Sequence, residues 1–346
     1  MSILPDLARL CRADRELAAP QVWQAAEELL DVSVSEAEKL DFLRALTDKG
    51  ETARELLAFT NAFLPKALDP GISGTWRGKP LLDCCGTGGG GLNVVNISTT
   101  MMFVLAAGGV PVVKHGNVGV TKISGSSDVL ATLGIPTTLT PEQNKRVFEA
   151  SNLGFFHAPF YHPTFKIIAP LRRALAAEGR RTVFNQLGPL INPARPDAQM
   201  IGLFNKNYVN LFGEVLELLG RKHHLAIYSE AEDGTPIGEY SILGHNFVHT
   251  SLKFDIPDRP RRDLGSYKSL IISGREESAR RIVDLLGGGE TGLFKEIMVA
   301  NSALGFVVTE TAKTWDEGLS LAREIIDSGK AKQKLEQWRN LCQTAR

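Results

Sequence analysis

Gly86-Thr87-Gly88-Gly89-Gly90-Gly91 follows the apolar run 81–85, and Lys114-His115-Gly116-Asn117 follows a second apolar run, 110–113. A glycine-dense turn after a strand lets backbone N–H groups approach an anion closely. A second strand that ends in a lysine, a histidine and an amide adds further donors, and ligands of open α/β sheets gather at such strand ends. Together the two segments indicate a phosphorylated substrate held at one edge of a sheet.

Short apolar runs alternate with helical windows through the rest of the chain, which favours βα units around a mostly parallel, doubly wound sheet. Ser98 and Ser126 are placed to cap the two helices that follow the quoted segments. Region 233–267 is rich in glycine, proline and charge and is expected to form loops or extended hairpins. We expect strands at 81–85, 110–113, 154–156, 182–184 and 225–228, and later helices at 276–286, 295–303 and 315–328.

The N-terminal segment has a different, helical pattern. Ser35 followed by Glu38 is typical of a capping box, and the helix that it opens is expected to end at Lys49-Gly50. Thr52 followed by Glu55 repeats the signal for a second helix. Short amphipathic helices in succession need a partner surface, which is either the core of this region or a second copy of the chain.

Composition and charge exclude several classes of protein. The chain has 346 residues, of which 43% are hydrophobic and 23% charged, so it can bury a substantial core. Lysine plus arginine and aspartate plus glutamate number 39 each, so no global field favours nucleic acid. The longest nearly uncharged apolar stretch, 101–113, is shorter than the ~20 residues of a membrane span.

Cysteine usage and the N-terminal charges indicate a cytoplasmic protein. Four cysteines show no metal-ligand spacing, and the adjacent pair Cys84-Cys85 lacks the geometry for a disulfide. Charged residues occupy the place where a signal peptide would need an apolar block. These charged residues are Asp6, Arg9 and Arg12, and the other two cysteines are Cys11 and Cys342.

Further polar segments decide how the glycine-rich turn is interpreted. A lone glycine-rich loop is equally consistent with a tight turn needed only for packing. Donors suited to phosphate recur, however, at predicted helix starts and strand ends, where ligands of α/β sheets gather. They lie in Asn96-Ile97-Ser98-Thr99, Lys114 to Asn117, Ser124-Gly125-Ser126 and the helical pair Arg172-Arg173.

With these motifs the chain resembles the anthranilate phosphoribosyltransferases, within the wider class that includes pyrimidine nucleoside phosphorylases. The family patterns G-T-G-G-D-G, N-I-S-T, K-H-G-N-R and S-G-S-A-D are similar to 86–91, 96–99, 114–117 and 124–128. Matches to the family also occur at 49–52, 161–163, 169–173, 184–193 and 328–331. The resemblance therefore spans nearly the whole chain.

The resemblance implies an enzyme of tryptophan biosynthesis that transfers the phosphoribosyl group of 5-phosphoribosyl 1-diphosphate (PRPP) to anthranilate and releases diphosphate. It implies a small helical domain, 1–70, completed by helices near 165–180, and an α/β domain, 75–346, that binds the donor. It also implies a homodimer paired through the helical domains. The donor would contact Gly86, Thr87, Gly88, Gly89, Asn96, Ile97, Ser98, Thr99, Lys114, His115, Gly116 and Ser126, and the acceptor Gly86, Asn117 and Arg172.

The resemblance also implies Mg²⁺ on the diphosphate, held here by Ser98 and Glu239, but the chain departs from the family at metal-binding positions. Gly90 replaces the loop aspartate, and Gly238 replaces one member of the later acidic pair. Two missing carboxylates predict a weakened metal site, because Mg²⁺ prefers hard anionic oxygens. Lys122 is hypothesised to replace part of the lost charge, and the role of Asp233 stays open.

Two alternatives remain at this stage. Val118 in place of an arginine, and three extra residues between Arg173 and Arg181, are compatible with a paralogue that uses a different aromatic or heterocyclic acceptor. The missing carboxylates are compatible with a non-catalytic relative that binds a ligand or nucleic acid, although the balanced charge argues against nucleic acid.

The histidines were interpreted from their neighbours. His115 is interpreted as a site residue, because other matched polar groups flank it. His162 is equally consistent with packing and with lining the acceptor pocket. His223-His224 is expected to be a solvated stretch before a strand.

Overall fold

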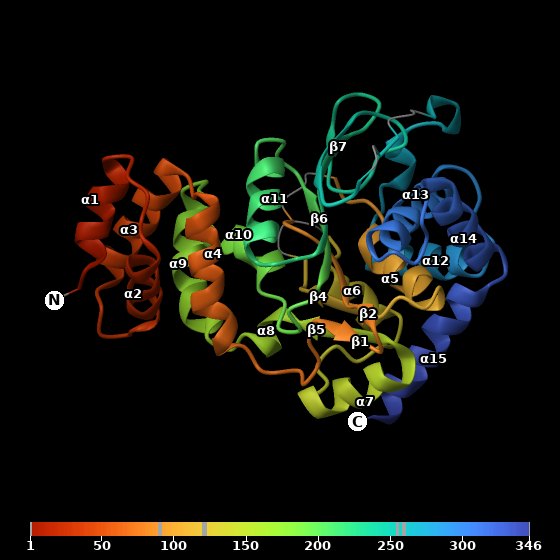
Figure 1. Ribbon diagram of the computed structural model, residues 1–346, viewed down its shortest axis with the longest axis horizontal. Helices are drawn as coiled ribbons and strands as arrows, with labels where there is room; N and C mark the ends of the chain where they lie inside the picture. The colour runs from red at the N-terminus through yellow and green to blue at the C-terminus, as the bar shows by residue number, and fades with distance from the viewer. Residues whose placement is uncertain (1, 89–91, 120–122, 254–255, 258–260, 346) are drawn as a thin grey trace.

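The computed structural model describes residues 2–88, 92–119, 123–253, 256–257 and 261–345. A helical N-terminal region lies beside a larger domain built on a mostly parallel sheet (Figure 1). The expected α/β class, with a helical region followed by a doubly wound sheet domain, is confirmed.

The sheet places the C-terminal ends of its central strands at one edge. Its order is β5-β4-β3-β6-β7-β8, and β9 also pairs with β7. Pairings from β5 to β7 are parallel, whereas β8 and β9 run antiparallel to β7. The main strands are β3 Leu82–Gly86, β4 Val112–Gly116, β5 Leu153–His157, β6 Ala198–Leu203, β7 His223–Glu230, β8 Pro236–Ile237 and β9 Asn246–Thr250, and a separate hairpin joins β1 Thr75–Trp76 to β2 Lys79–Pro80.

The strand order reverses at β3. The chain proceeds outward from β3 through β4 and β5, then returns to add β6 and β7 on the other side. A crevice forms at such a reversal, outside the C-terminal ends of the strands, and ligands of open α/β sheets bind there. Gly86 ends β3 at this position and pairs with Gly202 of β6.

Helices cover the two faces of the sheet and build the N-terminal region. The N-terminal region contains α1 Leu4–Arg12, α2 Ala19–Leu30, α3 Glu36–Lys49, α4 Ala53–Phe63 and the short η1 Leu64–Lys66, joined by α9 Phe165–Ala177. The remaining helices are α5 Ile97–Ala107, α6 Ser126–Thr132, α7 Pro141–Ser151, α8 Ala158–Tyr161, α10 Val183–Leu190, α11 Tyr208–Leu218, η2 Arg262–Leu264, η3 Tyr267–Leu270, α12 Arg275–Leu286, α13 Leu293–Val308, α14 Trp315–Asp327 and α15 Lys330–Thr344.

Alternating side chains of the strands divide the core into two large clusters. On β7, Leu225 and Ile227 join the cluster made with α5 and the C-terminal helices. The intervening Ala226 and Tyr228 join the cluster made with α4, α10 and α11. A period of two is what a strand buried on both faces requires. The N-terminal leucines that the sequence left open between core and dimer surface, such as Leu43 and Leu56, belong to this second core.

One expected strand is a helix. Residues 182–184 were predicted to form a strand, but Thr182 is the N-cap of α10, and its N–H donates to Asn185 Oδ1 at 2.9 Å. Val183, Phe184 and Leu187 are buried at helical spacing in the core shared with α4. A run of three residues, two of them apolar, is too short to distinguish the period of a strand from that of a helix, so the cap decides the outcome.

Strand β6 was missed because its sequence is not a continuous apolar run. Gln199 and Gly202 interrupt Ala198–Leu203, although all six residues are buried. Gln199 is satisfied inside the sheet, where its side-chain amide donates to Pro189 O at 2.6 Å. A buried polar residue whose hydrogen bonds are made inside the sheet therefore lowers the hydropathy of a central strand, so that the strand is not recognised from the sequence.

Helix starts were predicted correctly in part. Thr52 and Glu55 form the expected capping box of α4, with the Thr52 N–H donating to Glu55 Oε2 at 2.9 Å. Ser35 is the N-cap of α3 but makes no side-chain cap bond. Ser98 and Ser126 were wrongly expected to be N-caps; the caps are Asn96 and Gly125, and both serines lie in the first helical turn.

No helix among the described residues is both long enough and apolar enough to cross a bilayer.

Candidate active site

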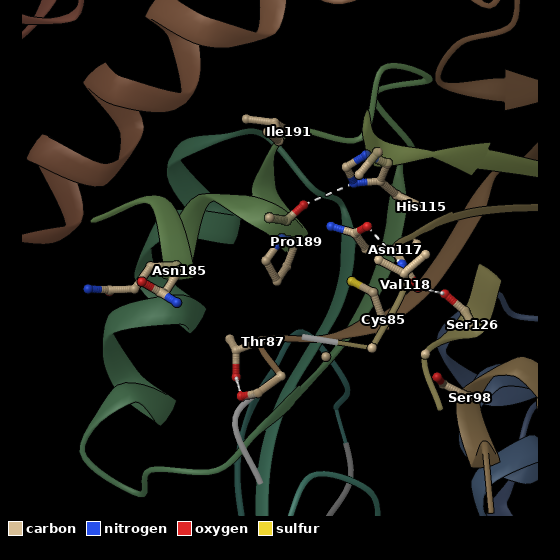
Figure 2. Close-up of a pocket in the computed structure, with 18 of the residues that line it drawn as sticks. Cys85, Thr87, Ser98, His115, Asn117, Val118, Ser126, Asn185, Pro189 and Ile191 are labelled. Carbon is tan, nitrogen blue, oxygen red and sulfur yellow. Dashed lines mark hydrogen bonds between the residues drawn. The ribbon is translucent and has the colours of Figure 1, made fainter. Parts of the chain in front are cut away.

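A cavity of about 510 Å³ lies at the C-terminal ends of β3 and β4, between the sheet and helices α9 and α10 (Figure 2). Its volume is in the range of small-molecule sites. Residues of four predicted motifs line it: the β3 turn, the start of α5, the end of β4 and the start of α6. The fold therefore brings together segments that the sequence keeps apart.

Lys114 is the buried cation at the floor of this cavity. Its side-chain ammonium donates to the Cys84 carbonyl on the neighbouring strand and to Ser98 Oγ at 3.1 Å. The carboxyl group of Asp83 is fully buried nearby, and although burial raises its pKa, the charge of Lys114 opposes that rise. An ammonium group has three N–H donors, so these two bonds leave one for a ligand.

Two helix N-termini face the same cavity and add main-chain donors. Asn96, the N-cap of α5, is held by Ser278, whose hydroxyl donates to Asn96 Oδ1 at 2.8 Å, and by Ser124 Oγ at 3.1 Å. The first N–H groups of a helix have no partner within the helix, and the helix dipole favours an anion there. This arrangement suits a phosphate group.

The loop after β4 is held against the start of α6. Asp128 Oδ2 accepts bonds from Gly119 N at 2.7 Å and Gly125 N at 2.8 Å. A side chain at Gly125 would collide with the backbone of 117–119, so the close approach requires glycine. Ser126 Oγ donates to the Asn117 carbonyl at 3.3 Å, which places it beside the cavity (Figure 2).

Arg172 approaches the cavity from α9. Its guanidinium is largely buried, and burial lowers its pKa without any described carboxylate acting to raise it. Arg173, the next residue, is exposed and lies outside the cavity lining. A largely buried guanidinium without an acidic partner suits a ligand carboxylate, because its two parallel N–H groups match the two carboxylate oxygens.

Most of the predicted site residues line the cavity. Ile97 is an exception, because its side chain is buried in the core. Gly89 lies outside the described residues. The predicted residues found in the lining are Gly86, Thr87, Gly88, Asn96, Ser98, Thr99, Lys114, His115, Gly116, Asn117, Ser126, Arg172 and Glu239.

Sequence reasoning missed the lining residues that come from segments without a motif. Lys166 lies on α9, Arg181 precedes α10, and Asn205 and Tyr208 lie at the start of α11. They are single polar residues in amphipathic stretches, where exposure to solvent is the ordinary expectation. The matched segment 184–193 could have pointed to Asn185 and Gln186, which also line the cavity.

Comparisons with known proteins agree with this geometry. A family model described as "Glycosyl transferase family, a/b domain" matches residues 78–332. The anthranilate phosphoribosyltransferase of Symbiobacterium thermophilum is 35% identical, and the alignment covers 96% of each chain. The chain belongs to the anthranilate phosphoribosyltransferase family.

Solved structures of this family share the fold. The anthranilate phosphoribosyltransferase of Thermus thermophilus has a TM-score of 0.86 and 32% identity, with 98% of this chain and 99% of that chain covered. The Saccharomyces cerevisiae protein, solved in complex with PRPP and Mg, has a TM-score of 0.83 at 22% identity, with 99% of each chain covered. The second likeness concerns the fold alone.

Of the family's acidic groups, the described cavity lining retains one carboxylate. Glu239 is the only acid among the described lining residues, against the cations Lys114, Lys166, Arg172 and Arg181. Asp233 is not in the lining; its carboxylate accepts from Thr235 N at 3.0 Å within a turn. The position of the second family carboxylate is Gly238, where the Phe204 ring occupies the space that a Cβ would fill.

The other positions at which the chain departs from the family pattern lie in different parts of the structure. Val118 lies in the cavity lining and is exposed. The extra residues after Arg173 lie at the end of α9, where Glu178 accepts two hydrogen bonds from Arg44 of α3, at 2.6 and 2.9 Å. This placement makes the insertion part of the α3–α9 surface. Gly90 and Lys122 lie outside the described residues, so the Lys122 hypothesis stays a prediction.

Two histidines form the wall between β4 and α8. The rings of His115 and His162 are 5.1 Å apart, edge to face, and both residues are buried. His115 Nδ1 lies 3.0 Å from the Gly188 carbonyl (Figure 2), which makes Nδ1 the protonated nitrogen. Burial lowers the pKa of His115 to about 3 and that of His162 to about 4. Both rings are therefore neutral at pH 7, and both line the cavity.

The lowered pKa of His162 predicts an acid-sensitive contribution to stability. An unfolded histidine has a pKa of about 6.5. Below that pH the unfolded chain binds a proton that the folded chain does not, so stability is lost as the pH falls from about 6.5 to about 4.

We expect the free energy of unfolding of the wild type, minus that of His162→Asn, to shrink by up to about 1.4 kcal/mol per pH unit across that window. Urea unfolding at several pH values measures it, and the subtraction cancels the contribution of the other titrating groups. A difference that stays constant between pH 7 and pH 4 would contradict the assignment.

Proposed function

We propose that this protein transfers the phosphoribosyl group of PRPP to the amino group of anthranilate; the relatives reported above are named anthranilate phosphoribosyltransferases. The single observation that carries the proposal is the pairing, in one cavity, of a phosphate cradle with a separate cation. The cradle comprises the Gly86 turn, Lys114 and the starts of α5 and α6, and the separate cation is Arg172. A phosphorylated donor and a carboxylated acceptor need these two features on opposite sides of the reacting bond.

The reaction needs alignment and charge neutralisation more than covalent help. A lone pair of the anthranilate nitrogen forms the N–C1 bond, the C1–O bond to diphosphate breaks, and the nitrogen releases a proton. Positive charge develops on the ribose and negative charge on the leaving diphosphate in an oxocarbenium-like transition state. Lys114 and the helix N-termini are placed to stabilise the departing diphosphate, and Arg172 and Asn117 are placed to orient the acceptor.

The residues present fit a Mg²⁺ ion that is bound mainly by the substrate. Ser98 and Glu239 both line the cavity and would hold the ion, which would neutralise charge on the diphosphate. Mg²⁺ sites commonly use one or two carboxylates and complete the shell with substrate phosphates and water. With one carboxylate in the described lining, affinity for the metal alone is expected to be low.

A homodimer through the helical region is the third part of the proposal. Trp23 of α2 and Val32, which follows α2, are 49% and 86% exposed. Exposed large apolar side chains are a common feature of subunit contacts. The resemblance noted from the sequence points to the same helical region.

Arg172 provides the decisive test of the acceptor. Arg172→Ala should raise the KM for anthranilate about 10- to 100-fold, the range expected for a lost charge-assisted pair, while the KM for PRPP stays within about twofold. Loss of anthranilate fluorescence in the presence of PRPP and Mg²⁺ measures the rate. Arg173→Ala is the matched control, because its side chain is exposed beside the site.

No turnover of anthranilate by the wild type, despite binding of PRPP, would refute the proposal and favour a different acceptor. An Arg172→Ala enzyme with unchanged KM for anthranilate would remove Arg172 from the acceptor site.

Glu239 tests the metal assignment. Glu239→Gln should raise the Mg²⁺ concentration needed for half-maximal rate by at least about fivefold, because the amide supplies no anionic oxygen. Rates measured over a Mg²⁺ series at saturating PRPP report the change. Asp233→Asn is the matched control, and equal shifts in both variants would argue against a specific role for Glu239.

Val32→Glu tests the dimer. Light scattering during gel filtration should give twice the chain mass for the wild type and a larger monomer fraction for the variant, because a charge placed in an apolar contact is costly. Leu218→Glu, on α11 outside the helical region, is the control. A monomeric wild type would contradict the proposal.

A further inference from the structure

A second cluster of ligating side chains lies away from the cavity, where α11, β7 and β9 meet. It consists of Glu217 near the end of α11, His224 at the start of β7 and His249 on the edge strand β9. One ligating atom from each residue lies within 4.8 Å of the others. The sequence predicted His223-His224 to be a solvated stretch; that expectation is wrong for His224, which is only 3% exposed.

The tautomer of His224 leaves an acceptor nitrogen directed at the cluster. Its Nδ1 lies 3.1 Å from the Arg221 carbonyl, so Nδ1 carries the proton and Nε2 carries the lone pair. Nε2 is buried and has no hydrogen-bond partner among the described residues, and it lies 3.9 Å from Glu217 Oε1. Histidines that bind metals usually donate the N–H of one ring nitrogen to a carbonyl, which leaves the other nitrogen available to the ion.

His249 is held over the same point by the shape of α11. Its Nε2 is 3.1 Å from Glu217 Oε1. Its ring lies over Gly213, where the Cβ of any other residue would overlap the imidazole. Glycine in a helix interior costs about 1 kcal/mol relative to alanine. The position therefore accommodates the imidazole at a cost in helix stability.

We propose that Glu217, His224 and His249 form a binding site for a divalent transition-metal ion of the zinc class. Two imidazoles and one carboxylate are ligands that Zn²⁺ accepts at about 2.0–2.2 Å, which separates neighbouring ligand atoms by about 3.3 Å in a tetrahedral shell. The two measured separations of 3.1 and 3.9 Å lie close to that value. Water would take the fourth position, since Glu217 and His249 are 57% and 24% exposed.

Without an ion, the cluster is a hydrogen-bonded His249–Glu217 pair beside a buried acceptor that lacks a partner. An unmade bond of this kind costs about 1–3 kcal/mol, which an ion at the cluster would relieve.

The site would fasten the edge strand to a helix that reaches the active site. Helix α11 begins at Tyr208, which lines the cavity, and Glu217 lies roughly 14 Å along its axis at 1.5 Å per residue. The ion would link α11, β7 and β9, and the loop between β8 and β9 begins with the cavity residues Gly238 and Glu239. It would be separate from the Mg²⁺ proposed on the diphosphate.

The test is a zinc titration of the full-length protein after chelator treatment and removal of the chelator, without PRPP or Mg²⁺. Competition with a chromogenic zinc chelator should give one Zn²⁺ per chain, and Co²⁺ should give the visible absorption of a nitrogen- and oxygen-ligated ion. Free Zn²⁺ at a concentration one hundred times its Kd should raise the Tm of the protein by about 3 °C.

His249→Ala and Glu217→Gln should each weaken zinc binding at least about tenfold. Gly213→Ala should weaken it as well, because its methyl group displaces the His249 ring. His223→Ala is the matched control and should leave the affinity within about twofold, because His223 lies outside the cluster. Glu217 is exposed, so its variant keeps the test valid if a histidine variant folds poorly.

No stoichiometric binding by the wild type, unchanged binding by His249→Ala and Glu217→Gln, or equal weakening by His223→Ala would each overturn the proposal. Turnover in excess Mg²⁺ is measured on the same zinc-free protein. That activity reports the proposed transferase function independently, so failure of one proposal is distinguishable from failure of the other.

Discussion

The buried ammonium group of Lys114 is the interaction on which the rest of the site depends. It joins three segments, because it lies on β4, donates to a carbonyl of β3 and donates to Ser98 in the first turn of α5. A charge removed from water is tolerated only when hydrogen bonds and an opposite charge replace the solvent. The carboxyl group of Asp83, on β3, is fully buried nearby, where the charge of Lys114 opposes the rise in its pKa, and it also accepts the His115 N–H at 3.1 Å. The cradle is therefore held in place by the electrostatics of the core.

The fixed ammonium group of Lys114 contributes to an excess of positive charge in the cavity. A fixed cation, two helix N-termini and three further cations from α9 and the start of α10 face one described carboxylate, Glu239. The field favours anionic ligands before any metal is bound. Phe204 fills the space beside Gly238, so the ring stands where the Cβ of a carboxylate residue at 238 would lie. His115 and His162, which are neutral at pH 7, complete the cavity wall and add no further positive charge to it.

Elements that are marked by a pattern of neighbouring residues were predicted from the sequence, whereas those that depend on contacts between distant segments were not. Strand β3, expected at 81–85, was predicted within one residue of its observed bounds, and β7, expected at 225–228, within two. The expectation of 110–113 for β4 overlaps only the start of Val112–Gly116, and the expected capping box of α4 is present. Strand β6 was missed because Gln199 finds its partners only across the sheet. The segment at 182–184 was assigned to the wrong class because Thr182 acts as a cap, which a run of only three residues does not reveal. Lys166, Arg181 and Tyr208 reach the cavity through the packing of helices, and no local pattern marks them.

The sequence by itself determined the fold class, the segments that line the cavity and the family, because glycine turns, strand ends and helix starts impose their geometry within a few residues. Only the tertiary structure decided which polar residues share a space. It placed Arg172 in the same cavity as the Gly86 turn, left Asp233 outside the cavity lining and buried His224 against Glu217 and His249. The physical reason is that the distance between two residues far apart in the sequence depends on how the helices pack against the sheet. That packing is set by many weak apolar contacts summed over the whole core.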